Sequence, residues 1–231
     1  MRVSSRLAGG VVLAAAVLLG GAAGQQAHAQ GGKKTASFNL TSVQSAPAGQ
    51  VTVTASVWLT PTQARMDVKS PIAGEGIVLV TNGYIYQLDK KAKKGVKVAL
   101  PAEMKKSPDN FGFFMSQFAF DASTAVQNAK KVRTETVSGY ACDVLTRSAS
   151  QGEASRSVTI WMPQKLEPRF PLKVVQQDKV QKPGASLSST TTITLSNVKV
   201  GQAIAPSTFA VPAGYQIKEG KPQPAGKPIG K

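Results

Sequence analysis

The sequence predicts a mainly β protein built on one antiparallel sheet, with a single helical segment acting as a plug or lid. Short runs of alternating apolar and polar residues recur along the chain, and short turns join them instead of long crossover connections. Only one stretch, in mid-chain, has apolar residues at helical spacing. Because the strands alternate, one face of the sheet should pack a core while the other meets water.

The clearest strand runs from residue 51 to 59, where the odd-numbered residues are all apolar and Thr52, Thr54 and Ser56 take the other face. The runs at 76–80 and 84–88 flank Asn82-Gly83, a pair that supplies the positive φ values of a tight hairpin turn. We count roughly ten strands of this kind. They cover about residues 37–44, 51–59, 65–69, 76–80, 84–88, 96–100, 131–137, 140–147, 157–162, 172–177 and 189–200.

The helical segment is expected from Ser107 to about Lys131. Ser107 can cap a helix, Pro108 is favoured at the first helical position, and Asp109 would interact well with the helix dipole. Gly112 weakens the pattern, so a looser loop followed by a shorter helix is the alternative.

The aromatic residues of this segment fall on two stripes. Phe111, Phe114, Met115 and Phe118 share one side of the helix, and Phe113 and Phe120 lie nearly opposite. A helix on a sheet needs only one apolar face, so the second stripe either packs as core or covers an apolar ligand. Both interpretations stay open.

Residues 1–29 are interpreted as a cleaved signal peptide. Two arginines precede an apolar run, and Ala27-His28-Ala29 is a small-x-small cleavage site. We expect one domain over residues 30–217 and a disordered tail rich in Lys, Pro and Gly over residues 218–231. No cysteine follows the signal, so the protein should be periplasmic or secreted without a lipid anchor.

The chemistry left to the mature chain is limited. Cleavage would remove His28, the one histidine, and with it histidine-based catalysis and histidine metal sites. Acidic residues are scattered singly, and the Ser196-x-x-Lys199 motif lies in a Thr-rich strand instead of at a helix start. We therefore expect no enzyme activity, no metal and no cofactor. The single Cys142 should be buried in a strand.

The charge of the chain favours anionic partners. The 28 basic residues include Arg2 and Arg6, so the mature chain would carry 26 basic against 12 acidic residues, a net charge of about +14. Such a field attracts an anionic membrane or cell-wall surface. Nucleic acid is not expected, because aromatic and basic residues do not interleave on a binding face. The oligomeric state stays open.

Several motifs occur in a characteristic order. They are Arg65-Met-Asp67 followed by the Asn82-Gly83-Tyr84 turn, Gly139-Tyr-Ala-Cys142, Trp161-Met-Pro163 with Phe170-Pro-Leu-Lys173, and Phe209 with Pro212-Ala-Gly-Tyr215. Over about residues 35–217 this order resembles the LolA/LolB-like superfamily of outer-membrane lipoprotein carriers. The resemblance implies an incomplete β-barrel, or half-barrel, closed by helices around an apolar cavity for acyl chains of lipoproteins or other lipids.

The resemblance and the aromatic stripes together predict a lipid cavity beneath residues 108–120. Arg65 is included by its position, and the two tryptophans either line the cavity or pack as core. The candidate ligand-binding residues are Phe111, Phe113, Phe114, Met115, Phe118, Phe120, Trp58, Trp161 and Arg65.

Two functions remain open at this stage. The first is a non-enzymatic envelope carrier that binds a lipid, a lipoprotein acyl chain or another amphiphile. The second is a structural or regulatory envelope protein of the same fold that contacts another protein or an anionic cell-wall polymer.

Overall fold

The computed structural model describes residues 34–107, 109–112, 114, 126, 128–182 and 185–220 of the 231-residue chain. Within these residues there are twelve strands, a short α-helix and a 3-10 helix. They are β1 (Ala36–Ala46), β2 (Gly49–Leu59), β3 (Ala64–Ser70), β4 (Gly74–Thr81), β5 (Tyr84–Asp89), β6 (Lys94–Ala99), α1 (Ala102–Lys106), β7 (Lys130–Val137), β8 (Tyr140–Gln151), β9 (Ala154–Pro163), β10 (Lys173–Lys182), β11 (Ala185–Val200), η1 (Pro206–Phe209) and β12 (Gln216–Glu219). Residues 111, 112, 114 and 126 are helical as well.

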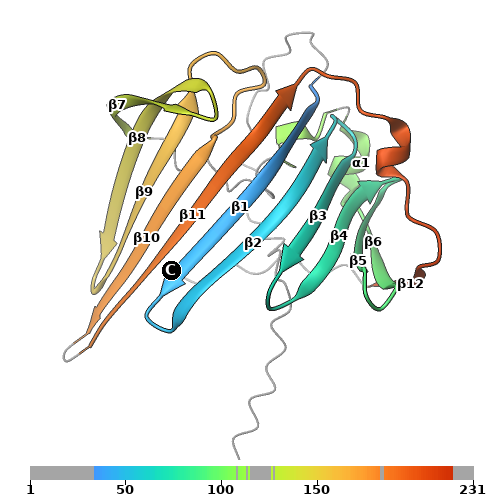
Figure 1. Ribbon diagram of the computed structural model, residues 1–231, viewed down its shortest axis with the longest axis horizontal. Helices are drawn as coiled ribbons and strands as arrows, with labels where there is room; N and C mark the ends of the chain where they lie inside the picture. Colours follow the sequence, from blue (N-terminus) through green and yellow to red (C-terminus); the bar gives the residue numbers. More distant parts are fainter. Residues whose placement is uncertain are drawn as a thin grey trace, which may run out of the picture.

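All twelve strands belong to one open sheet in the order β12-β6-β5-β4-β3-β2-β1-β11-β10-β9-β8-β7. Neighbouring strands are antiparallel, except that β12 lies parallel to β6. The sheet curls into an incomplete barrel with β12 and β7 at its two edges (Figure 1). This confirms the predicted fold class.

The alternating residues of β2 and the turn residues at 82–83 form the structures that the sequence predicts. In β2 the side chains of Val57 and Leu59 are fully buried, while Thr52 and Thr54 are exposed. The β4–β5 hairpin turns through Asn82 and Gly83, whose φ values are 52° and 76°. These are the positive values that a tight turn between twisted strands requires.

Two apolar layers cover opposite faces of the β1–β6 part of the sheet. We call the face that carries Val57 and Leu59 the inner face, and the face that carries Trp58 the outer face. Phe111 and Phe114 pack with Val57 and Leu59 in the main core. On the outer face, Ile77, Leu79, Tyr86 and Leu88 form a second cluster with Phe209 of η1, joined by Ile204, Val211, Tyr215 and Ile217. The C-terminal segment therefore covers part of the outer face, and in Figure 1 it runs from β11 to β12 in orange and red.

The mid-chain segment also reaches the other half of the sheet. A third cluster joins Val158, Ile160 and Met162 of β9 with Val174 of β10, and Val126 packs against it. Described residues of the mid-chain segment thus contact both the main core, through Phe111 and Phe114, and this cluster, through Val126.

The start of the mid-chain helix differs from the prediction. Residues 102–106 already form α1, and Ser107 ends that helix instead of beginning the next. The N–H of Phe111 donates to Oδ1 of Asp109 over 2.9 Å, and the N–H of Phe114 donates to the carbonyl of Asn110 over 2.9 Å. Asp109 is therefore the capping residue, because its carboxylate accepts from the free N–H of Phe111 in the first turn. Pro108 and residues 115–125 lie outside the described residues.

The last strand extends beyond the predicted C-terminal end of the domain. Strand β12 continues to Glu219, two residues beyond the expected domain end at 217. The proposed signal peptide at 1–29 and the tail from residue 221 lie outside the described residues. None of the helices in the described part of the chain has the length and apolar character needed to cross a membrane.

Candidate functional site

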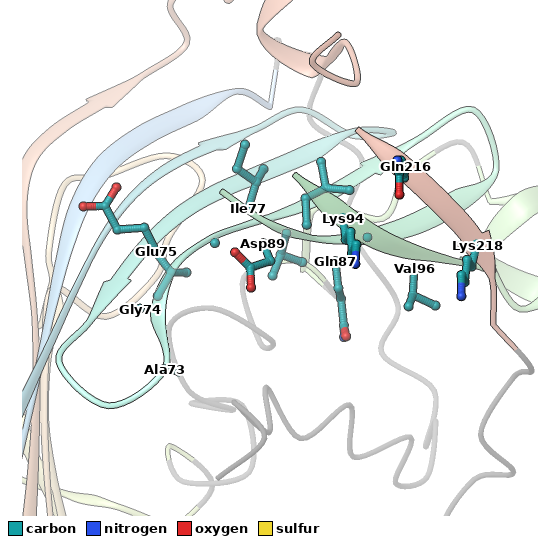
Figure 2. A pocket seen from close by; sticks show the side chains of 15 residues that line it. Ala73, Gly74, Glu75, Ile77, Gln87, Asp89, Lys94, Val96, Gln216 and Lys218 are labelled. Atoms are coloured by element: carbon teal, nitrogen blue, oxygen red, sulfur yellow. The ribbon is translucent and has the colours of Figure 1, made fainter. Parts of the chain in front are cut away.

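A cavity of about 520 Å³ lies beside β3, β4, β5, β6 and β12 (Figure 2). Strand pairing places its central residues on the inner face, because Val78 lies opposite Gln87, which lies opposite Val96. Figure 2 shows Gln87 and Val96 pointing to one side of the sheet and Ile77 to the other. We call this cavity the groove; its lining residues are Val68, Ala73, Gly74, Glu75, Gly76, Ile77, Val78, Gln87, Leu88, Asp89, Lys94, Gly95, Val96, Gln216 and Lys218.

The inner-face floor of the groove is apolar. Val68, Val78 and Val96 come from three different strands, and Val78 also packs against the main core. Val96 is 41% exposed, which makes it one of four large apolar side chains that stand out on the described surface. The groove is therefore an apolar surface that no described side chain fills.

One bank of the groove is polar and carries positive charge. Gln216 pairs with Lys94, and Lys218 pairs with Val96, so β12 adds polar side chains beside the apolar floor. Asp89 accepts hydrogen bonds from the backbone N–H groups of Lys91 and Ala92, both over 2.8 Å. Within the described residues neither Lys94 nor Lys218 forms an ion pair. Two cationic groups are thus available at this bank.

Strand β12 is fixed to the sheet at both of its ends. The N–H of Gln216 donates to the carbonyl of Lys93 over 2.9 Å, and the N–H of Gly220 donates to the carbonyl of Lys97 over 2.8 Å. Lys97 also forms a 2.9 Å ion pair with Glu219, which raises the pKa of Lys97. A Cβ on Gly220 would approach Cγ1 of Val96 to 2.5 Å, so only glycine lets the chain pass so close to β6.

The described phenylalanine candidates lie in the core. Phe111 is 4% exposed and Phe114 is 1% exposed, and both belong to the main core. Neither lines the groove. Phe113, Met115, Phe118 and Phe120 lie outside the described residues, so a role for them in binding a ligand stays a prediction.

Trp161 also packs in the main core. Its indole N–H donates to Oε2 of Glu135 over 2.5 Å, and Nζ of Lys173 lies 4.5 Å from its ring centre. Hydrogen bonds from Trp161 and Arg133 hold the pKa of Glu135 below its usual value. Trp161 is not among the groove residues.

Trp58 and Arg65 lie on the outer face, so the structure does not bring them together with Phe111 and Phe114. Trp58 packs against the second cluster, and the Arg65 guanidinium carbon lies 5.9 Å from its ring centre. Arg65 donates to both carboxylate oxygens of Asp67 over 2.6 and 3.0 Å, and to the carbonyl of Thr208 over 2.9 Å. In the structure Arg65 therefore ties the C-terminal segment to β3.

The carboxylate beneath Arg65 is stabilised in its charged form. Burial alone would raise the pKa of Asp67, but hydrogen bonds from Arg65 and from Lys90 at 3.2 Å outweigh it, and the pKa is lowered. The same pairing raises the pKa of Arg65. Both groups stay charged at neutral pH.

Sequence reasoning missed Val96, Lys94 and Lys218. A signal existed for Val96, because Val96 and Val98 alternate with lysine in a predicted strand and so share one face. Lys218 had been assigned to the tail, since the four residues of β12 show no clear alternation.

The expectation about the single cysteine is confirmed by the structure. Cys142 in β8 is fully buried, as predicted, and burial raises the pKa of its thiol. Among the described residues, no group of three or more His, Cys, Asp and Glu side chains could hold a metal ion.

No known family model matches the chain, and no curated protein sequence matches it either. Solved structures with a similar fold do exist. A chain of the MucA/MucB complex of Pseudomonas aeruginosa is 14% identical with a TM-score of 0.42, and the match covers 79% of this chain and 58% of that one. The lipoprotein LppX of Mycobacterium tuberculosis is 12% identical with a TM-score of 0.41, over 75% of this chain and 90% of that one.

A putative outer membrane lipoprotein-sorting protein domain of Vibrio parahaemolyticus is 8% identical with a TM-score of 0.33, over 76% of this chain and 89% of that one.

Proposed function

We propose that this protein binds an amphiphile non-enzymatically, with an acyl chain on the floor of the groove, and carries it in the cell envelope. The observation that supports this most is Val96, 41% exposed in a cavity of about 520 Å³. Binding sites for small molecules typically measure about 300–1,000 Å³ and are mostly apolar with a few placed polar groups. The groove has both properties.

An acyl chain gains enough from such a surface to bind usefully. Burial of one methylene contributes about 0.8 kcal/mol, so a chain of about 16 carbons offers roughly 12 kcal/mol before the costs of binding are subtracted. A groove that buries only half of the chain still offers about 6 kcal/mol. The expected affinity is therefore in the micromolar range or weaker.

The polar bank suggests the head group. Lys94 and Lys218 lie on neighbouring parallel strands without ion pairs among the described residues, beside the apolar floor. A carboxylate or phosphate can lie between them while its chain follows the valines. We infer that the ligand is an anionic amphiphile, such as a fatty acid or an acidic phospholipid.

The place of action follows from the first residues of the chain. The arginines, apolar run and Ala27-His28-Ala29 site at residues 1–29 have the pattern of an export signal. We therefore propose that the protein works in the periplasm or outside the cell, where membrane lipids and lipoproteins are available.

A pair of matched variants tests the proposed site. Val96 and Val132 are both strand valines with large exposure, 41% and 51%, but only Val96 lines the groove. Titration with the fluorescent fatty acid cis-parinaric acid should give at least tenfold weaker binding to V96D than to V132D. The aspartate at position 96 would lose its hydration on contact with the acyl chain, and its charge would repel the carboxylate of the fatty acid. Equal affinities, with both variants folded by circular dichroism, would remove the groove from the proposal.

A further inference from the structure

A second hollow, of about 550 Å³, lies on the outer face, where β11, β1, β2 and β3 run side by side. Its lining is more polar than that of the groove. Five side chains are neutral and polar, four are charged, three are aliphatic, and Trp58 is the aromatic one. They are Asn39, Thr41, Thr54, Ser56, Ser196, Asp67, Lys69, Glu75, Lys90, Leu40, Ala55, Val68 and Trp58, of which Val68 and Glu75 also line the groove.

The neutral side chains form a regular array. Asn39 of β1 lies opposite Ser196 on one side and Ser56 on the other, and Thr41 lies opposite Thr54. Neighbouring strands are about 4.8 Å apart, so each step across the sheet presents one polar group per strand. This spacing is close to the length of one pyranose unit.

Most of these polar groups are free to bind a ligand. In the described part of the chain, Ser56 donates to Oδ1 of Asn39 over 3.1 Å, and the amide nitrogen of Asn39 makes no hydrogen bond. The hydroxyls of Thr41, Thr54 and Ser196 make none within the same residues. A hydroxyl both donates and accepts, and an amide offers two donors, so the array matches the mixed donors and acceptors of a sugar.

The charged side chains that line the hollow sum to zero, and Arg65, which also pairs with Asp67, lies outside the lining. Lys90 lies 3.2 Å from Asp67, and Lys69 lies 3.8 Å from Glu75. Two cations therefore face two carboxylates, in a chain whose overall charge is strongly positive. A hollow without net charge favours a neutral ligand over an anionic one.

Trp58 supplies an apolar platform at one end of the array. Its ring is half-buried, since one part packs on the second cluster beside Arg65 and another part lines the hollow. Aromatic rings with one apolar contact and one wet edge are common at binding surfaces. The C–H face of a pyranose can pack against the part of the ring that lines the hollow while its hydroxyls reach the array.

We propose that this hollow binds an uncharged oligosaccharide, with one sugar ring against Trp58 and its neighbours along Asn39, Ser56 and Ser196. The polar array lies on the face opposite the groove floor, and only Val68 and Glu75 line both hollows, so the proposal does not rest on lipid binding. A protein with both sites would contact a glycan polymer through its outer face while its inner face holds an amphiphile.

Two tryptophans make a direct measurement possible, because the chain contains only Trp58 and Trp161. Titration of the ¹⁵N-labelled protein with chitotetraose or cellotetraose should shift the indole resonance of Trp58 in a saturable way. The indole of Trp161 is buried and donates to Glu135, so its resonance should not move.

A pair of matched variants tests whether oligosaccharide binding depends on the residues of the hollow. N39A should weaken binding at least fivefold. Q177A is the control, because Gln177 on β10 accepts from Ser157 in a similar cross-strand pair but lies outside the hollow, and it should leave binding unchanged. Tetragalacturonate, the charged probe, should bind more weakly than the neutral tetramers. Absence of a Trp58 shift at 10 mM neutral probe, equal effects of the two variants, or salt-sensitive binding of tetragalacturonate alone would each overturn the proposal.

Discussion

Replacement of Arg65 by methionine separates a structural role for this residue from a role in binding the ligand. Methionine keeps the apolar stem beside Trp58 but removes the guanidinium, which contacts Asp67 and the carbonyl of Thr208. The proposed groove lies on the other face of the sheet. R65M should therefore lower the free energy of unfolding and leave the affinity for the lipid unchanged.

The size of the effect follows from the burial of the pair. The side chains of Arg65 and Asp67 are 19% and 21% exposed, between an exposed pair worth about 0–1 kcal/mol and a fully buried one whose disruption costs about 3–5 kcal/mol. Lys90 still supports Asp67, so about 1.5 kcal/mol is a reasonable loss for the pair, and the bond to Thr208 adds about 1 kcal/mol. The expected loss of unfolding free energy is about 2.5 kcal/mol, or roughly 5–10 °C in Tm for a domain of this size.

Urea unfolding at pH 7 measures this loss, with K69M as the control. Lys69 and Glu75 are 3.8 Å apart with side chains 76% and 51% exposed, so K69M should change the unfolding free energy by less than about 0.5 kcal/mol. If R65M is as stable as K69M, the Arg65 contacts do not hold the C-terminal segment. If R65M stays fully stable and loses lipid binding instead, Arg65 belongs to the ligand site.

The same variant has a pH signature. The pKa of Asp67 is lowered in the folded protein, so its contribution to stability is present above the unfolded pKa of about 3.9 and is lost as pH falls through the folded value. R65M removes the main cause of the lowered pKa. Its unfolding free energy should therefore fall less steeply than that of the wild type as the pH is lowered from about 4, and equal slopes would contradict the assignment.

Three further predictions follow from the described core. F114A should lose about 3–5 kcal/mol of unfolding free energy in urea, because Phe114 is 1% exposed in the main core, and a loss below 1 kcal/mol would mean that the mid-chain segment is not anchored there. G95A should lose about 1–3 kcal/mol, since a Cβ would meet Leu88 and lie 2.9 Å from the carbonyl of Gln87, whereas a Cβ on Gly112 meets nothing within 4 Å and G112A should cost nothing. Cys142 should resist Ellman's reagent in the native protein and react fully in urea, because its thiol is buried with a raised pKa, and rapid native reaction would contradict that burial.

Much of the fold could be predicted because it rests on local chemistry. Alternation identified β2, and Asn82-Gly83 marked the hairpin formed by β4 and β5. Strand β12 could not be predicted in this way. It is only four residues long and forms because its backbone pairs in parallel with β6, a contact between residues that are far apart in the sequence. Helix α1 is five residues long without a side-chain cap, so it too lacks a local signal.

The candidate site was less accessible from the sequence. Trp58 was grouped with Phe111, although alternation along β2 already places it opposite Val57 and so on the other face. Arg65 shares that face, because it lies directly opposite Trp58 on β3. The groove was missed because its floor combines Val68, Val78 and Val96, and only the order of strands in the sheet shows that these three lie together.

A spin-labelled fatty acid, 16-doxyl-stearate, tests the groove most directly. In a methyl NMR spectrum of the full chain, the bound nitroxide should broaden the resonances of Val68, Val78 and Val96, and ascorbate reduction of the label should restore them. The methyls of Val132 and Leu187, both exposed but outside the groove, serve as internal controls and should stay sharp. No broadening at a saturating concentration, or equal broadening of groove and control methyls, would contradict the claim that the groove holds the acyl chain.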